Sequence, residues 1–206
     1  VSGGPPAVVD ALRAVVGDAG TVVVPTFTGQ YTDPATWEAP PVPDDWIEPI
    51  RQSRPPYRPA LTPTRGVGSI PECLRTYPDA VRSSHPEVSF AAIGADADRL
   101  VAEHGFDDGL GEGSPLARLY DADATVLLLG VGHEVNTSLH LAEYRADVDA
   151  ERVRKSAPVV EDGERVVVEY DDQALSTDDF PALGTAFERE VGVVEGSVGA
   201  ATAKLA

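Results

Sequence analysis

Short runs of β-branched and aliphatic residues alternate along this chain with segments of helical spacing, and this alternation constrains the fold more than any other feature. The run TVVVPTF at 21–27 predicts a strand buried on both faces, and TVLLLG at 125–130 predicts another. Residues 5–16 carry apolar residues at helical spacing behind a proline. The sequence therefore predicts an α/β fold with a mixed β-sheet flanked by helices.

Other segments add detail to this prediction. Two β-branched runs at 157–172 are joined by Asp162-Gly163, which predicts an inserted β-hairpin. Residues 31–63 hold nine prolines and both tryptophans, so we expect a long loop or flap there. A loop leading into a short strand is expected at 80–94, and the Gly- and Ala-rich tail shows no clear pattern. Further helices are expected at 95–104, 113–123 (with Ser114 as N-cap), 136–146 and 178–192.

Several classes of protein are disfavoured by the sequence. No apolar stretch approaches the roughly 20 residues that a membrane-spanning helix needs, and the first residues do not resemble a signal peptide. We therefore expect one soluble, cytoplasmic domain over residues 1–206. Cys73 is the single cysteine, which excludes an internal disulfide. No group of His, Asp and Glu has metal-ligand spacing, so no metal is expected.

The charge of the chain is strongly negative, with 34 acidic and 16 basic residues and a net charge of −18. Such a field repels nucleic acids and anionic membranes and attracts cations. One interpretation is a solvated acidic surface of the kind found in salt-adapted proteins, and the other is an acidic cleft for a polycationic substrate. The spread of Asp and Glu along the whole chain favours the surface interpretation, although the two are compatible.

The glycine-rich corner at 130–146 is the most informative candidate site. Asn136 or Thr137 can cap the expected helix, which places His140 in its first turn and Glu143 three residues later on the same face. The helix N-terminus disfavours the imidazolium, and Glu143 could orient the ring. A neutral, oriented histidine suits a general base. Spacing alone, however, favours the alternative of an ordinary capped helix with a satisfied histidine.

A second cluster of polar residues could bind phosphate groups. Arg82, Ser83, Ser84 and His85 lie in one short segment, and Arg65 stands beside two glycines that allow close backbone approach. Neither GxxxxGK[ST] nor GxGxxG occurs, and a purely structural loop is an equally good interpretation. His104 is expected at the end of a helix, where a histidine interacts favourably with the helix dipole. His133 could line the candidate site or be exposed to solvent.

At this point the residues resemble a known family. The segments that carry the resemblance run in order from about residue 2 to residue 202: VVVPTFTGQY, PTRGVGSIPECLRTYP, RSSHPEVSFAAIG, GSPLARLYDADATVLLLGVGHEVNTSLHLAEYRA and DDFPALGTAFE. Together they resemble the aminoglycoside 3-N-acetyltransferases. The resemblance implies a mixed α/β fold distinct from the GNAT acetyltransferases. It also implies transfer of the acetyl group of acetyl-CoA to a primary amine of an aminoglycoside.

The resemblance also implies roles for residues. His140 would deprotonate the acceptor amine with support from Glu143, and Thr137 would lie beside the thioester. The residues expected to line the coenzyme A channel are Thr64, Gly66, Gly68, Ser69, Arg82, Ser83, His85 and Ser89. Because carboxylates bind polycationic amines, Asp33, Asp178 and Asp179 are candidates for the substrate wall. We expect a monomer or homodimer.

The chain departs from the family pattern at both ends. The family has a strand ending in His-Ser-Ser before the GGP helix, and a last helix after the segment that ends here in TAKLA; neither is in the printed sequence. We therefore expect the domain to lack these two elements. Alternatives remain open: a non-catalytic CoA-binding relative, or an N-acetyltransferase of a non-antibiotic amine. A hydrolase using Ser83 or Ser84 with His85 is disfavoured, because neighbouring residues cannot easily form a nucleophile–base pair.

Overall fold

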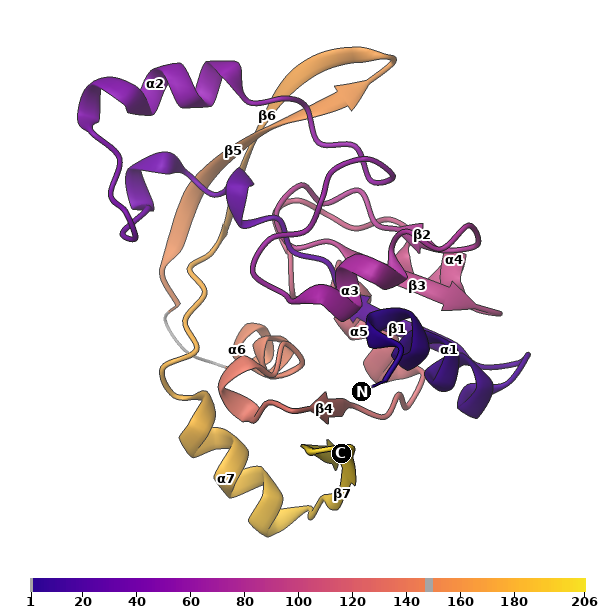
Figure 1. Cartoon of the computed structure of the whole chain (residues 1–206). Helices are drawn as coiled ribbons and strands as arrows, with labels where there is room; N and C mark the ends of the chain where they lie inside the picture. Colours follow the sequence, from indigo (N-terminus) through magenta and orange to yellow (C-terminus); the bar gives the residue numbers. More distant parts are fainter. Residues whose placement is uncertain (1, 147–149) are drawn as a thin grey trace.

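The computed structural model describes residues 2–146 and 150–206 of the chain (Figure 1). Within this part of the chain the strands form three sheets. The first contains β1 (Thr21–Pro25), β3 (Phe90–Gly94) and β2 (Val81–Arg82) in that order, and the second contains β4 (Leu127–Leu129), β8 (Ala201–Leu205) and β7 (Val194–Val198). The third is the hairpin of β5 (Arg152–Glu161) and β6 (Glu164–Gln173).

Helices and short 3-10 turns connect and cover these sheets, which confirms the α/β class. The α-helices are α1 (Gly4–Val16), α2 (Asp44–Ser53), α3 (Ser69–Leu74), α4 (Ala97–Val101), α5 (Pro115–Asp121), α6 (Leu139–Arg145) and α7 (Phe180–Glu190). The 3-10 turns are η1 (Gly29–Tyr31), η2 (Pro34–Thr36) and η3 (His133–Val135). None of the helices in the described ranges combines the length and the apolar character that crossing a bilayer requires.

The expected single mixed sheet is replaced by separate antiparallel ones. All the strand pairs of the described residues are antiparallel. The connection through α3 does set β1 and β2 in the same direction, as an alternation of strands and helices predicts. However, β3 inserts between them and pairs antiparallel with both, with Val23 opposite Ala92 and Arg82 opposite Ala91.

Strand β1 lies between two apolar clusters but is only half-buried. Val22 and Val24 pack on the cluster that contains Val9 and Leu74, whereas Val23 packs on the cluster that contains Phe90. Both faces are therefore covered, as the unbroken apolar run predicts. The prediction of full burial was wrong because β1 is at the end of its sheet, where one edge has no neighbouring strand within the described residues.

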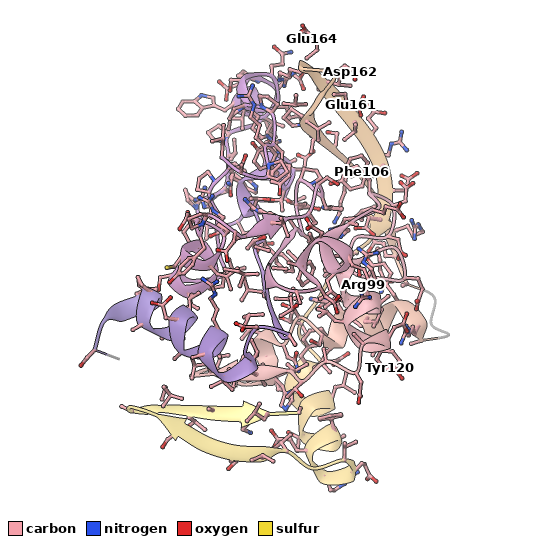
Figure 2. All side chains as sticks on the ribbon, turned by 90° about the vertical axis from the view of Figure 1, so that its right-hand side faces the viewer. Arg99, Phe106, Tyr120, Glu161, Asp162 and Glu164 are labelled. Atoms are coloured by element: carbon pink, nitrogen blue, oxygen red, sulfur yellow. The ribbon has the colours of Figure 1, made fainter. Side chains whose placement is uncertain are left out.

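The hairpin β5–β6 confirms the prediction from Asp162-Gly163. These two residues have φ values of 50° and 84°, the left-handed conformation that a tight type I′ turn requires. Figure 2 shows Glu161, Asp162 and Glu164 together at the hairpin tip. Just below the tip the hairpin packs on the flap, where the Tyr57 N–H donates to the Pro158 carbonyl over 2.7 Å.

Two elements were missed in the sequence. The expected flap contains α2, which continues through Pro49. The first turn of α2 has two aspartates, whose negative charge interacts favourably with the helix dipole. The tail forms the β7–β8 hairpin, whose strand β8 pairs with β4. In Figure 1, α6 lies between the base of the β5–β6 hairpin and β4, and α7 leads from that hairpin to the β7–β8 hairpin.

Candidate active site

Helix α6 brings His140 and Glu143 together as the i, i+3 spacing predicts. The Nδ1 atom of His140 lies 2.6 Å from Oε2 of Glu143. The helix begins at Leu139, later than expected, with Ser138 as its N-cap residue. Asn136 shapes the turn before the helix instead of capping it, because its side-chain oxygen accepts the Ser138 N–H over 3.1 Å.

The environment of His140 holds the imidazole neutral near pH 7. The residue is 5% exposed, and this burial lowers its pKa below the ordinary value, whereas Glu143 acts in the opposite direction with a smaller effect. The low pKa of His140 therefore results from burial and not, as the sequence suggested, from the helix N-terminus. Since a carboxylate only accepts, we assign the proton to Nδ1, which leaves Nε2 as the basic atom.

Phe180 forms one wall of the His140 site and was not recognised in the sequence. This residue begins α7, is 1% exposed, and places its ring 4.7 Å from the imidazole. The sequence separation of forty residues hides the contact, because helical periodicity reports only neighbours within one helix. The sequence pointed to Asp178 and Asp179 as site residues but not to Phe180, which follows them.

Arg82 and Ser89 of the expected coenzyme set lie in a buried polar cluster. The Arg82 guanidinium donates through Nε to Thr26 Oγ1 and Ser89 Oγ, each over 3.0 Å. It also donates to the carbonyls of Pro59 and Thr62 and, over 2.6 Å, of Thr26. These bonds tie the flap to the end of β1, so most of the donors of this arginine are engaged by protein oxygens.

Ser83 and His85 are buried as well, and the structure does not pair them with each other. Ser83 Oγ accepts the Phe90 N–H and lies 2.9 Å from Nδ1 of His104, whose Nε2 donates to the Gly109 carbonyl over 2.7 Å. His85 Nδ1 instead accepts two backbone N–H groups of the turn that follows it. The hydrolase interpretation with Ser83 and His85 is therefore wrong, and the Ser83–His104 pair was missed.

Burial also dominates the protonation of these two histidines. It lowers the pKa of His104 to about 4 and lowers the pKa of His85 well below its ordinary value. The two rings pack against each other at a tilt, with centroids 4.8 Å apart and planes inclined by 39°. Both therefore act as neutral hydrogen-bonding groups of the interior, and the expectation that His104 interacts with a helix dipole gives way to this role.

The remaining coenzyme candidates form a more exposed loop. Gly66 and Gly68 have φ values of 93° and 84°, which favour glycine, and Ser69 begins the short helix α3. Thr64 donates through its N–H and hydroxyl to one carboxylate oxygen of Glu72. Although partial burial opposes ionisation, bonds from Arg75 and Thr64 lower the pKa of Glu72 to about 2.

A cavity of about 880 Å³ connects part of this region to solvent. Arg82, Ser83 and Ser84 line it together with Arg75, so coenzyme candidates and an additional arginine share one hollow. Its volume suits a small-molecule ligand. His140 is not among the residues that line it. The structure therefore places two of the coenzyme candidates, Arg82 and Ser83, at this cavity and the His140–Glu143 pair at another place. Thr137 belongs to the second place, since its carbonyl accepts the His140 N–H over 3.2 Å.

The three candidate substrate acids differ in their surroundings. Asp33 is paired with Arg51 over 2.8 Å; its burial opposes ionisation, but this bond lowers the pKa of Asp33. Asp178 and Asp179 are exposed and directly precede Phe180, the residue that contacts His140. They lie at the start of α7, next in the chain to the residue that contacts His140.

Comparisons with known proteins place this geometry in context. The model of the aminoglycoside 3-N-acetyltransferase family matches residues 1–206. The SPbeta prophage-derived aminoglycoside N(3')-acetyltransferase-like protein YokD of Bacillus subtilis is 41% identical over the whole chain, which covers 75% of that protein. Its crystal structure superimposes with a TM-score of 0.95, and the chain covers 76% of it.

Two further relatives carry descriptive names. Aminoglycoside N(3)-acetyltransferase VII of Streptomyces paromomycinus is 45% identical over 81% of this chain, and the match covers 57% of that protein. The structure of AAC-IIIb in a binary complex with CoASH is 33% identical over 98% of this chain and 78% of its own, with a TM-score of 0.85. These likenesses confirm the fold that the sequence resemblance implied.

Proposed function

This chain belongs to the aminoglycoside 3-N-acetyltransferase family, and we propose that it transfers the acetyl group of acetyl-CoA to a primary amine of an aminoglycoside, with His140 as general base. The observation that carries the proposal is the buried His140–Glu143 pair, joined over 2.6 Å at the start of α6. The CoASH bound to AAC-IIIb supports acetyl-CoA as the co-substrate.

The base is needed because an ammonium ion has no lone pair with which to attack. His140 Nε2 first removes a proton from the acceptor ammonium, and the lone pair that this frees then attacks the thioester carbonyl carbon. As the carbon–sulfur bond breaks, the nitrogen gives up a second proton, which the leaving thiolate takes up, so coenzyme A departs as its thiol and the acetyl group remains on the nitrogen as an amide. Glu143 stabilises the imidazolium that forms, because its carboxylate already accepts the Nδ1–H.

Acidic side chains near the base suit a polycationic acceptor. Asp178 and Asp179 are exposed immediately before Phe180, and we assign them to the wall that binds the substrate amines. The net charge of −18 adds a long-range attraction for such a substrate. Asp33 is the weaker candidate of the three, because Arg51 already neutralises it.

The coenzyme is assigned to the cavity lined by Arg82, Ser83 and Ser84. Arg75 also lines this cavity but is paired with Glu72, and the neighbouring loop with Gly66 and Gly68 supplies exposed backbone groups of the kind that contact phosphate. Thr64, His85 and Ser89 act in this assignment mainly by holding the loop and the cavity wall in place. Ser69 is exposed at the start of α3, within the same loop region. The pantetheine arm must then extend from the cavity to Thr137 beside the base.

A thiol-release assay tests the proposed reaction. Acetyl-CoA is supplied with a panel of aminoglycosides and simple polyamines, and free thiol is measured for the wild type and for His140→Ala. We expect a loss of roughly 10²-fold or more in kcat while the protein stays folded. Val135→Ala, an exposed change in the same corner, serves as the matched control. Full turnover by His140→Ala refutes the base.

One observation favours a second candidate, a non-catalytic CoA-binding relative: His140 does not line the cavity that holds the coenzyme candidates. Calorimetry separates the two functions. Binding of acetyl-CoA without thiol release in the presence of any amine on the panel supports the second candidate. Thiol release with polyamines but not with aminoglycosides instead indicates an N-acetyltransferase of a non-antibiotic amine.

A further inference from the structure

Helix α7 presents one stripe of residues to the corner that carries His140. Phe180, Gly184 and Glu188 are spaced four residues apart, so they lie on the same face of the helix. Phe180 contacts the His140 ring at 4.7 Å with the two planes inclined by 58°. The other two positions of the stripe contact His133, which lies in the 3-10 turn η3 before α6.

The middle position of the stripe requires a glycine. A Cβ atom added to Gly184 would lie 2.2 Å from Cγ of His133, a distance at which the helix could not keep its place. The backbone of α7 therefore packs directly on the imidazole of His133. This close approach fixes how near the helix comes to the corner, and with it the distance between Phe180 and His140.

Hydrogen bonds hold His133 in this position against Gly184 and connect it to the start of α6. Nε2 of His133 lies 3.1 Å from Oε1 of Glu188, and its Nδ1 lies 3.2 Å from Nδ2 of Asn136. Asn136 accepts the N–H of Ser138, the N-cap residue of α6. The stripe on α7 and the first turn of α6 are thus joined by a continuous set of contacts.

The charged groups considered around His140 lie on its own helix, α6, and on α7. Glu143 lies on its own helix and contacts the ring directly. Of the α7 side chains, Glu188 is occupied by His133 and Lys204, and Asp178 and Asp179 are exposed at the helix start. Phe180 is the group from α7 that touches the ring, and it offers an apolar surface that cannot solvate an imidazolium.

We propose that Phe180 is a positioning residue for the acetyl-transfer reaction: its ring keeps the His140 imidazole desolvated and aligned with Glu143. In this proposal the contact of Gly184 with His133 fixes the position of α7, and therefore of Phe180. The proposal rests on the proposed function of His140 as the base. It assigns to α7 a role in the chemistry that acts through the contact of Phe180 with the imidazole.

Two measurements on the purified protein test the proposal. The titration of the His140 ring is followed by NMR in histidine-labelled protein, with His140→Asn used to assign its signal, and the pH dependence of kcat/KM is measured with acetyl-CoA and an accepted amine. In Phe180→Ala, water reaches the ring and the imidazolium is better solvated. We expect the His140 titration and the acid limb of the rate profile to move together to higher pH. For such a limb, each pH unit of displacement lowers the rate about tenfold at a fixed acidic pH.

Two further variants and a control complete the test. Gly184→Ala is expected to displace α7 and to shift both readouts in the same direction, and Phe180→Leu, which keeps an apolar side chain, is expected to shift them less. Leu183→Ala is the matched control, because this side chain also lies on α7 but is 41% exposed. It should leave the titration of His140 unchanged.

The outcomes separate this proposal from the proposed function. An unchanged His140 titration in folded Phe180→Ala, or in Phe180→Leu and Gly184→Ala if the alanine variant does not fold, overturns the role of Phe180. If the NMR titration of His140 shifts but the acid limb of the kcat/KM profile does not, His140 is not the base. The positioning role of Phe180 in the reaction is then refuted as well, but the conclusion that Phe180 desolvates the ring remains.

Discussion

Replacing His104 by glutamine should flatten the dependence of protein stability on acidic pH. His104 is 3% exposed, and burial lowers its pKa to about 4, against about 6.5 in an unfolded chain. The neutral ring accepts from Ser83 and donates to the Gly109 carbonyl. A glutamine can still donate to that carbonyl but cannot take up a proton at these pH values.

The sign and size of the effect follow from proton linkage. The unfolded state binds a proton at His104 more readily than the folded state, so the stabilisation is fully present above pH 6.5 and is lost as the pH falls towards 4. Between pH 7 and pH 5, these two pKa values correspond to a loss of about 2 kcal/mol in the free energy of unfolding. His85 contributes in the same direction, because burial lowers its pKa too.

Urea denaturation at pH 5, 6 and 7 measures this slope in the wild type and in His104→Gln. The variant should be less stable at pH 7, because the bond with Ser83 is weakened, but its stability should fall by about 2 kcal/mol less between pH 7 and pH 5. The contribution of His85 remains in both proteins and largely cancels. Equal slopes in the two proteins would show that His104 does not enter the folded state as a buried neutral ring.

Other predictions address the base and the interior. Glu143→Gln removes the carboxylate that raises the pKa of His140, so the acid limb of the kcat/KM profile should move to lower pH while kcat falls roughly 10-fold or more; a limb that moves to higher pH contradicts this. Gly109→Ala should destabilise by about 1–3 kcal/mol in urea denaturation, because the added Cβ would lie 2.8 Å from Val88 and 2.9 Å from Asp172. The control Gly105→Ala meets nothing within 4 Å, and an equal loss there would refute the steric argument.

The sequence correctly predicted features that depend on interactions between residues close together in the chain, such as a helix cap and a tight turn. Ser114 caps α5 by accepting the Leu116 N–H over 3.1 Å, and Asp162-Gly163 forms the expected turn. The His140–Glu143 contact follows from helical spacing in the same way. These features depend on residues within four positions of one another, so a single sequence contains the information needed to predict them.

Features that depend on distant partners were not predictable in this way. The insertion of β3 between β1 and β2 is decided by long-range pairing, and β7 is exposed along its length, so it carries no alternating apolar pattern. In the candidate site, the contact of Phe180 with His140 and the bond of Ser83 with His104 join residues far apart in the chain. Periodicity and capping rules do not describe such contacts.

The pairing of β1 with β3 also sets the order in which the chain can fold. Pro25 faces Phe90, so this sheet forms only when the whole intervening segment has closed into a loop, at an entropic cost that grows with loop length. The β5–β6 hairpin, in contrast, needs only a two-residue turn and can form early. Leu141 of α6 belongs to the same apolar cluster as Phe90 and Ala92 of β3, so the cluster that receives the helix with His140 is complete only after that loop has closed.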